Sequence, residues 1–568
     1  MVENKITFSD RIGDLLVKEK LISNDQLNEA ERMSKDLGIS LGQALVDTSA
    51  VAEEDLMSFI ARELELPHID VTGYSIESEV LKFIPASLAR KHLLIPLFKV
   101  EDTLTVAMAD PINVFALDEI RLQAGLDVSP VLASAESIRK AIEEYYGSAE
   151  SIKEAVRAVG TASFDMPSME HLSKHKLELI TNQPPVIRLV NELILHAINQ
   201  GASDIHIEPR RDIDDLRYRV DGYLHKVSTI PKNMHLAVVS RLKVMADLDI
   251  TERRVPQDGR ISIEMLGRDV DIRMSTFPTI EGEKVVLRVL DKTKSVTDLE
   301  SIGLSQTLLR DVRNLIKTPS GLILSCGPTG SGKTTTLYTI LNAIRSPDKN
   351  IVTLEDPVEY NIPDINQGQI NPKAGLTFAS GLRTILRQDP DIIMVGEMRD
   401  VETAELGIRA VLTGHLVLST LHTLDAGGAT ARLMDMGVEP FLVASALMAV
   451  IAQRLVRRIC PNCKTEYRPS EEMIKIMGIE HPEEHKFYHG TGCIQCHHLG
   501  YKGRTGVFEL MIVKYKIREL IMQKAPVNDI HDAAVSFGMR TLREDGLDKV
   551  FAGVTTLEEV MRETMSRE

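Results

Sequence analysis

Residues 321–340 read GLILSCGPTGSGKTTTLYTI. An apolar run, a glycine-rich turn and a stretch free of helix breakers follow one another, the order of a buried strand, a phosphate-binding loop and a helix. Gly327, Gly332, Lys333 and Thr334 complete the pattern G-x-x-x-x-G-K-T. In such a loop, backbone N–H groups surround phosphate, the lysine meets the β- and γ-phosphates, and the hydroxyl binds Mg²⁺. The stretch predicts an α/β domain with a nucleotide site.

The setting of this loop disfavours a chance glycine-rich turn. The helix expected from Lys333 onward directs the positive end of its dipole at a bound anion. The residues expected to contact the nucleotide are Gly327, Pro328, Thr329, Gly330, Ser331, Gly332, Lys333, Thr334 and Thr335.

A second apolar run, DIIMVGE at residues 391–397, ends in Glu397. Ligands of α/β folds gather at the carboxyl ends of the strands, so this carboxylate is a candidate to polarise the attacking water. The competing interpretation is a structural pair with Arg399.

Three acids follow the strand expected over Ile351–Leu354, in the run LEDPVEY. Glu355, Asp356 and Glu359 form a cluster that can hold Mg²⁺ through water. Further along, TGHLVLSTLHT places His415 and His422 at the two ends of a strand expected over residues 416–421. A lone histidine is more often structural, but the paired placement favours phosphate sensing by at least one of them.

Two C-x-x-C hooks, CPNC and CIQC, supply Cys460, Cys463, Cys493 and Cys496, with 29 residues between the hooks. Each hook sets two thiolates on one tight turn, which predicts a tetrahedral Zn²⁺ site; free thiols or redox use are the alternatives. Four thiolates leave no open position, so the role is structural. The fifth cysteine, Cys326, is expected to be a small buried residue.

The composition of the 568 residues is that of a folded protein, with 43% hydrophobic residues and a net charge of −16. Roughly three or four domains are expected. The charge disfavours a nucleic-acid partner. The cysteine content and the absence of a secretory signal indicate a cytosolic chain. The uncharged run Phe441–Gln453 is shorter than the ~20 residues of a membrane helix, so we expect membrane contact only through partners.

Pattern changes along the chain suggest successive parts. We expect a duplicated helical module at 1–66, a small α/β domain at 67–147, a linker at 148–184, a second α/β domain at 185–298 and the nucleotide domain at 299–568, with a zinc element at 460–496.

The combination of GPTGSGKTTT, TLEDPVEY, LRQDPDIIMVGEMRD and TGHLVLSTLHT resembles the secretion and pilus-assembly ATPases, in which these are the Walker A, Asp box, Walker B and His box elements. The resemblance implies an α/β fold: a RecA-like P-loop ATPase domain preceded by a PAS-like α/β domain and an N-terminal helical plus α/β region. It implies a homohexamer that hydrolyses ATP with Mg²⁺.

By the same resemblance, Lys333 and Thr334 bind phosphate and Mg²⁺, Glu397 is the catalytic carboxylate, and the Asp-box acids position water or metal. It also implies that four arginines act on phosphate, two in the second domain and two before Walker B, where their charge suits the transition state. These are Arg273, Arg288, Arg383 and Arg387. Without the resemblance each is best interpreted as a surface ion pair.

The long N-terminal region and Asp425 in LHTLDA resemble the pilus-extension branch more than the type II secretion branch, which is the second interpretation. Either branch implies an inner-membrane platform protein and accessory proteins as partners. A non-enzymatic adaptor and a DNA translocase are the competing classes.

The N-terminal helices resemble a module that in some relatives binds cyclic di-GMP. Arg11, Ile12 and Gly13 match its R-L-G start, while Lys20 and Ser49 stand where glycine is usual and Ser40 replaces arginine in the second copy. A docking module for the platform or an accessory protein is the alternative.

Overall fold

The computed structural model describes residues 15–19, 21–37, 41–48, 50–51, 53–64, 66–71, 74, 76, 78–111, 113–145, 181–265, 268–291 and 298–565. They divide into two compact units, Met1–His196 with Ser228–Arg241 and Ala197–Val227 with Leu242–Glu568. The predicted linker falls almost wholly outside the described residues, as do Arg11, Ile12, Gly13, Lys20, Ser40 and Ser49.

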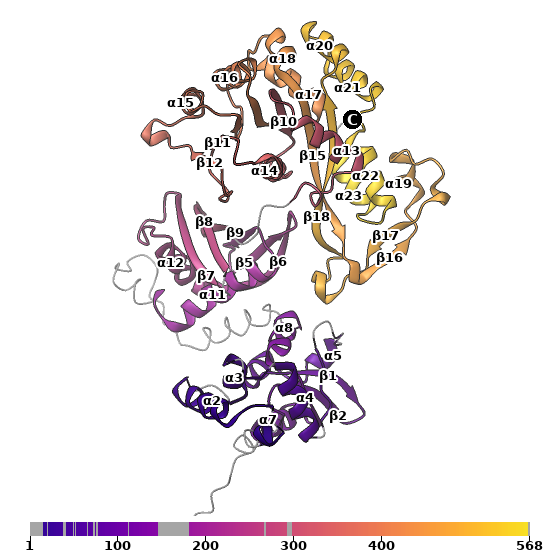
Figure 1. Cartoon of the computed structure of the whole chain (residues 1–568). Helices are drawn as coiled ribbons and strands as arrows, with labels where there is room; N and C mark the ends of the chain where they lie inside the picture. The colour runs from indigo at the N-terminus through magenta and orange to yellow at the C-terminus, as the bar shows by residue number, and fades with distance from the viewer. Residues whose placement is uncertain are drawn as a thin grey trace, which may run out of the picture. The chain divides into compact units, whose positions relative to one another are not determined.

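The N-terminal part begins with helices that share a small apolar core containing Leu16, Leu45 and Phe59. A three-stranded sheet of order β1-β2-β3 follows, in which β1 and β2 are antiparallel and β3 joins β2 in parallel. A parallel pair needs a crossover, and α7 supplies it. The elements are α2 Asn24–Leu37, α3 Leu41–Asp47, α4 Glu53–Leu64, α5 Ser78–Leu81, α6 Ala86–His92, β1 Leu94–Val100, β2 Thr103–Met108, α7 Val114–Ala124, β3 Asp127–Leu132 and α8 Ala135–Tyr145 (Figure 1).

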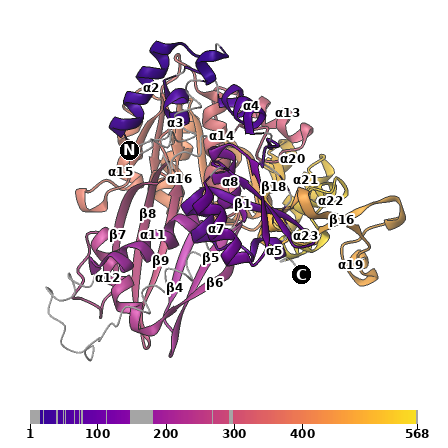
Figure 2. The same ribbon diagram turned by 90° about the horizontal axis from the view of Figure 1, so that it is seen from below.

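The next part is built on a six-stranded sheet of order β6-β5-β4-β9-β8-β7. The long strands β7, β8 and β9 lie side by side in Figure 2, paired antiparallel with their neighbours. The elements are α11 Pro184–Asn199, β4 Asp204–Glu208, β5 Ile213–Val220, β6 Tyr223–Pro231, α12 His235–Met245, β7 Gln257–Met265, β8 Arg268–Thr279 and β9 Gly282–Asp291.

The C-terminal part contains a seven-stranded sheet of order β12-β11-β13-β14-β10-β15-β18, parallel except for β18. Both faces are covered, as parallel sheets require. Leu322 and Leu324 of β10 pack in one core with residues of α16 and α18, whereas Ile323 between them packs in a second core with residues of α13 and α14.

The elements of this part of the chain, among which β16 and β17 form a separate two-stranded sheet, run from red through orange to yellow in Figure 1. They are α13 Gln306–Leu315, β10 Gly321–Cys326, α14 Lys333–Ile344, β11 Ile351–Glu355, β12 Asn366–Gln369, α15 Phe378–Ile385, β13 Ile392–Val395, α16 Val401–Leu412, β14 Leu416–Leu421, α17 Ala426–Asp435, α18 Pro440–Ala446, β15 Leu447–Ile459, β16 Lys464–Tyr467, α19 Glu471–Ile476, β17 Phe487–Gly490, β18 Tyr501–Ile512, α20 Tyr515–Met522, α21 Val527–Ser536, α22 Leu542–Phe551 and α23 Leu557–Thr564.

Local chemistry sets several of these boundaries. The side chain of Asp400 accepts a hydrogen bond from the Thr403 N–H at 2.8 Å and so begins α16, and Asp425 begins α17 by accepting from the Gly428 N–H at 2.6 Å. Such caps satisfy N–H groups that the first helical turn leaves unpaired. The uncharged run Phe441–Gln453 is divided between α18 and β15, and among the described helices none has the length and apolar composition needed to cross a membrane.

Candidate nucleotide and metal sites

The loop between β10 and α14 depends on glycine at two positions. Gly327 and Gly332 have φ of 150° and 89°. A Cβ at Gly327 would lie 2.6 Å from the carbonyl oxygen of Gln453, and one at Gly332 would lie 2.9 Å from its amide nitrogen. That amide donates to the Ser331 carbonyl at 2.6 Å. The glycines therefore allow the loop to pack against β15, which fixes its shape.

Lys333 begins α14 and is only 8% exposed. Its Nζ donates to the carbonyl oxygens of Gly327 and Pro328 at 2.8 and 3.0 Å. Burial lowers the pKa of this ammonium group. A buried cation at the start of a helix is a strong attractor for phosphate, which would restore the interactions lost on leaving water.

A cavity of about 860 Å³ opens above this loop. Its walls come from the loop residues 328–335, from the ends of β11, β13 and β14, and from β4, β5, β6 and β9 of the preceding sheet. Among the predicted site residues it is lined by Arg288, Glu355, Asp356, Glu359, Glu397 and His422.

Glu397 lies two residues beyond β13, which ends at Val395, earlier than the sequence suggests. Its carboxylate is 2.5 Å from a guanidinium nitrogen of Arg399 and 3.7 Å from Nε2 of His422. The carboxylate of Glu397 therefore both pairs with Arg399 and lines the cavity. Burial and the charge of Lys333 lower the pKa of His422, which favours the neutral ring at neutral pH.

Glu355 is 2% exposed and held by neutral donors. Tyr338 of α14 donates to one carboxylate oxygen; Thr353 and Gln367 donate to the other at 2.6 and 3.1 Å. The Tyr338 hydroxyl also accepts from the Glu359 N–H at 3.3 Å. This network ties the phosphate-loop helix to the acidic cluster, and its donors keep a buried carboxylate in one orientation.

The two second-domain arginines lie on neighbouring strands. Arg273 of β8 is directly opposite Arg288 of β9. Arg273 lies 3.8 Å from Glu359, and Nε of Arg288 donates to Asp204 at 3.2 Å. Both arginines therefore meet carboxylates that line the nucleotide cavity.

Four predicted catalytic residues lie outside the cavity lining, namely Arg273, His415, Arg383 and Arg387. His415 precedes β14 at the end opposite His422, where Nδ1 is 2.7 Å from the Ala410 carbonyl oxygen. Arg383 on α15 pairs with Glu402, and Arg387 is exposed. Of the two histidines, the structure brings only His422 to the other predicted groups.

Tyr223, Arg457 and Arg562 also line the cavity, and the sequence patterns did not reveal them. The guanidinium carbon of Arg457 lies 3.9 Å from the ring centroids of Tyr223 and Tyr501, and that of Arg562 lies 4.5 Å from the Tyr223 ring. Glu559, 1% exposed, accepts from both arginines. Tyr223 lies more than two hundred positions before the other four residues, and no local motif links it to them.

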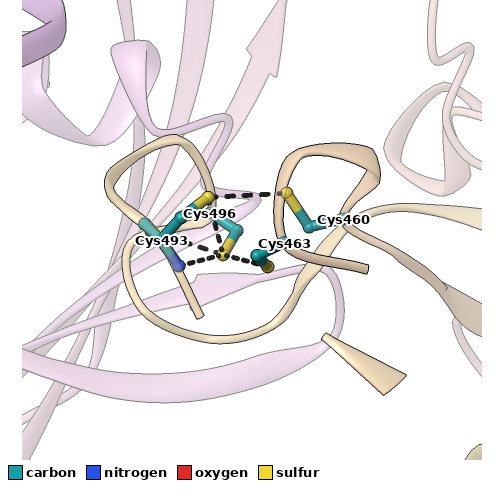
Figure 3. A group of neighbouring side chains, drawn as sticks. All are labelled: Cys460, Cys463, Cys493 and Cys496. Atoms are coloured by element: carbon teal, nitrogen blue, oxygen red, sulfur yellow. Dashed lines mark hydrogen bonds between the residues drawn. The ribbon is translucent and has the colours of Figure 1, made fainter. Parts of the chain in front are cut away.

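The four hook cysteines converge in the structure, and Figure 3 shows their sulfur atoms facing one another from two loops. All four Sγ atoms lie within 4.8 Å of one another. The N–H groups of Gly492 and Gly500 donate to Cys463 and Cys496 sulfur atoms at 3.3 Å each. Four soft donors with backbone N–H support fit Zn²⁺. Burial raises the pKa of the remaining cysteine, Cys326, to about 12, which agrees with a buried unreactive thiol.

Comparison with known proteins gives two family matches. A model described as "Type II/IV secretion system protein" matches residues 180–562, and one described as "MshEN domain" matches residues 64–152. The second match falls on the small α/β domain rather than on the helical segment that carries Arg11, Ile12 and Gly13.

Individual relatives extend this result. The chain is 43% identical over 561 residues to the type IV pilus assembly ATPase PilB of Myxococcus xanthus, covering 98% of this chain and 99% of that protein. It is 47% identical over 435 residues to the type II secretion system ATPase E of Vibrio cholerae, covering 76% of this chain and 86% of that protein. The X-ray structure of the Yersinia pseudotuberculosis ATPase DotB resembles it in fold, with a TM-score of 0.51 and 20% identity over 71% of this chain and 99% of that one.

Proposed function

Because the chain belongs to the family of type II/IV secretion system proteins and is a motor ATPase of that family, we propose that it drives the assembly of a type IV pilus. The observation that carries the proposal is the match to a pilus assembly ATPase over 98% of this chain, including the N-terminal part. The type II secretion system protein E of Xanthomonas campestris also matches over 98% of this chain, at 40% identity against 43% for the pilus assembly ATPase, so secretion is the second candidate.

In the proposed reaction, Lys333 takes the β- and γ-phosphates and Glu397 orients and polarises the attacking water. His422, 3.7 Å from Glu397, is in reach of the same groups. Arg273 and Arg288 offset the charge that develops on the γ-phosphate, and Arg383 and Arg387 act from the segment before Walker B. Glu355, fixed by Tyr338, positions the acidic cluster.

Mg²⁺ is the cation that this donor set fits. Thr334 is exposed and lines the cavity, and Asp356 and Glu359 line the same cavity. Hard oxygen donors that leave room for water suit Mg²⁺. When bound, the ion would neutralise charge on the β- and γ-phosphates.

For mechanical coupling we propose a homohexamer in which binding of ATP closes the second domain on the nucleotide domain. The support is that β4, β5, β6 and β9 contribute walls to the cavity that holds the phosphate loop. A ligand that contacts both domains favours the state in which they are close, and product release favours the open state.

The remaining ligands and partners are proposals of the same kind. Zn²⁺ holds Cys460, Cys463, Cys493 and Cys496 as a structural site, and the MshEN match supports cyclic di-GMP as a ligand of residues 64–152. Isothermal calorimetry with cyclic di-GMP tests whether the nucleotide binds. An absence of binding heat would contradict cyclic di-GMP as a ligand and favour the alternative, a docking module for the platform or an accessory protein. The protein acts in the cytoplasm and reaches the inner membrane through a platform protein and accessory assembly proteins; nucleic acid is not a partner.

The decisive experiment is deletion of the gene and complementation with wild-type and Glu397→Gln chains. We expect loss of surface pili with normal exoprotein secretion, rescued only by the wild type. Loss of secretion with normal pili would contradict pilus assembly and establish the second candidate. DNA-stimulated hydrolysis by the purified protein would contradict both.

A further inference from the structure

A row of charged residues crosses the second-domain sheet. Arg260 of β7 is directly opposite Arg273 of β8, which is opposite Arg288 of β9. Arg288 is opposite Asp204 of β4, and Asp204 is opposite Arg219 of β5. Residues directly opposite each other in antiparallel strands project from the same face. The five side chains therefore share one face of the sheet.

This face of the sheet borders the nucleotide cavity. Asp204, Arg219 and Arg288 line that cavity together with the phosphate loop. Arg260, Arg273 and Arg288 line a second cavity, of about 430 Å³, on the neighbouring strands. Since Arg288 belongs to both, the row of arginines runs without interruption from the nucleotide site to Arg260.

The row is only partly neutralised by the protein. Asp204 lies 3.2 Å from Arg288 and 3.5 Å from Arg219, and Glu359 lies 3.8 Å from Arg273. For Arg260, which is exposed, no carboxylate lies within ion-pair distance among the described residues. Like charges directly opposite on a sheet destabilise it. An anion that binds beside the row would therefore relieve the repulsion among the three adjacent arginines.

We propose that Arg260 is a third phosphate-contacting arginine, which acts with Arg273 and Arg288 on the triphosphate of ATP. The inference rests on the proposed role of Arg273 and Arg288. Neighbouring strands lie about 4.8 Å apart, so the three arginines form an extended cationic surface rather than a pocket for one small anion. Guanidinium forks match phosphate oxygens in geometry and charge.

The test uses the full-length chain and three substitutions of Arg260: to Ala, Gln and Lys. Arg254→Ala is the matched control, because Arg254 is close in sequence, has a side chain 87% exposed and pairs with Glu252 at 2.8 Å. Binding of a non-hydrolysable ATP analogue, ADP and AMP is measured by calorimetry, with ATPase kcat and KM and thermal unfolding alongside. Arg273→Ala is measured in parallel.

We expect Arg260→Ala and Arg260→Gln to bind the ATP analogue ~10- to 100-fold more weakly, the effect of losing a charged hydrogen bond, and to bind AMP as the wild type does. Arg260→Lys should be intermediate. Unchanged analogue binding in the Gln variant, or equal weakening for AMP and the analogue, would overturn the inference. A wild-type protein without ATPase activity would instead contradict the proposed function. If the wild type is active, Arg273→Ala binds the ATP analogue more weakly and Arg260→Gln binds it normally, only the role of Arg260 is disproved.

Discussion

Nζ of Lys333 lies 3.4 Å from Nδ1 of His422, while the same ammonium group donates to two carbonyl oxygens of its own loop. Phosphate is a stronger partner than a carbonyl, so ATP should displace these contacts. We expect Lys333→Ala to lose both ATP binding and hydrolysis.

Glu397→Gln should separate binding from hydrolysis. The amide keeps the shape of the side chain but cannot polarise water as a carboxylate does, so ATP affinity should stay within about threefold while kcat falls by ~10²-fold or more. Calorimetry measures the ATP affinity, and a steady-state ATPase assay measures kcat. Normal turnover in Glu397→Gln or Lys333→Ala would disprove the site assignment.

The two histidines of the His box should differ in their effects. His422→Gln removes a neutral ring beside Lys333 and Glu397, whereas His415→Gln affects a contact with a backbone carbonyl at the far end of β14. Because burial and Lys333 lower the pKa of His422, the ring gains a proton only as the pH falls below its usual range, which then places a second cation beside Lys333. The acidic limb of the kcat profile should change in His422→Gln and persist in His415→Gln. An identical acidic limb in the kcat–pH profiles of the two variants would contradict this role of His422.

Tyr338→Phe should weaken the acidic cluster without altering the phosphate loop directly. It removes a donor from the buried Glu355, which costs about 1–3 kcal/mol when a buried acceptor loses its partner. We expect lower thermal stability and a lower kcat, with a smaller change in KM. Tyr360→Phe is the control, since Tyr360 contacts the Tyr338 ring edge-on at 4.6 Å and Phe retains that contact. Equal effects of the two substitutions would argue against the hydrogen bond.

Zinc should be bound at one equivalent per chain and resist mild chelation. Cys463→Ser and Cys496→Ser should lose the metal and lower the melting temperature, because the site joins two loops by metal–thiolate bonds. Cys326→Ser should retain the metal, since Cys326 lies under the phosphate loop and outside the cluster. Protein purified without chelator that contains no zinc would refute the site.

The contact between His531 and Glu509 should make stability depend on pH. Nε2 of His531 lies 3.5 Å from Glu509, which is nearly buried and also accepts from the Ala426 N–H at 2.9 Å. The hydrogen bond with Glu509 raises the pKa of His531. The stabilisation is therefore complete below the unfolded pKa and lost as the pH rises through the folded one.

His531→Gln should consequently lower the free energy of unfolding by about 1 kcal/mol at pH 6 and by little at pH 9. His481→Gln is a suitable control, because His481 and Glu483 are paired at 3.5 Å with side chains 69% and 71% exposed. Denaturant titrations at the two pH values measure the difference. If His531→Gln lowers the free energy of unfolding equally at pH 6 and pH 9, the result would contradict the ion pair.

Much of the nucleotide domain follows from local patterns. The apolar run before Gly327 forms β10, the residues from Lys333 form α14, and the run between the two histidines forms β14, because buried strands and capped helices have strong short-range signals. The cysteine hooks also converge as their spacing predicts.

The rest depends on register between distant strands. That Arg260, Arg273 and Arg288 form one row follows from the pairing of β7, β8 and β9, which no single segment encodes. Likewise, Tyr223 meets Arg457 only through tertiary structure. The prediction for His415 shows a different limit: the sequence places the two histidines at opposite ends of one strand, but the motif alone does not say which of them meets the other predicted groups.

Strand β15 carries Gln453, whose amide holds the phosphate loop, and it ends beside Cys460. Cys460 is seven positions after Gln453 along the extended chain, about 23 Å at 3.3 Å per residue. Over this length the strand is hydrogen-bonded to β18 and cannot easily stretch. Strand β15 therefore links the phosphate loop to the cysteine cluster, and we expect a shift of the loop that moves Gln453 along the strand axis to be transmitted to that cluster.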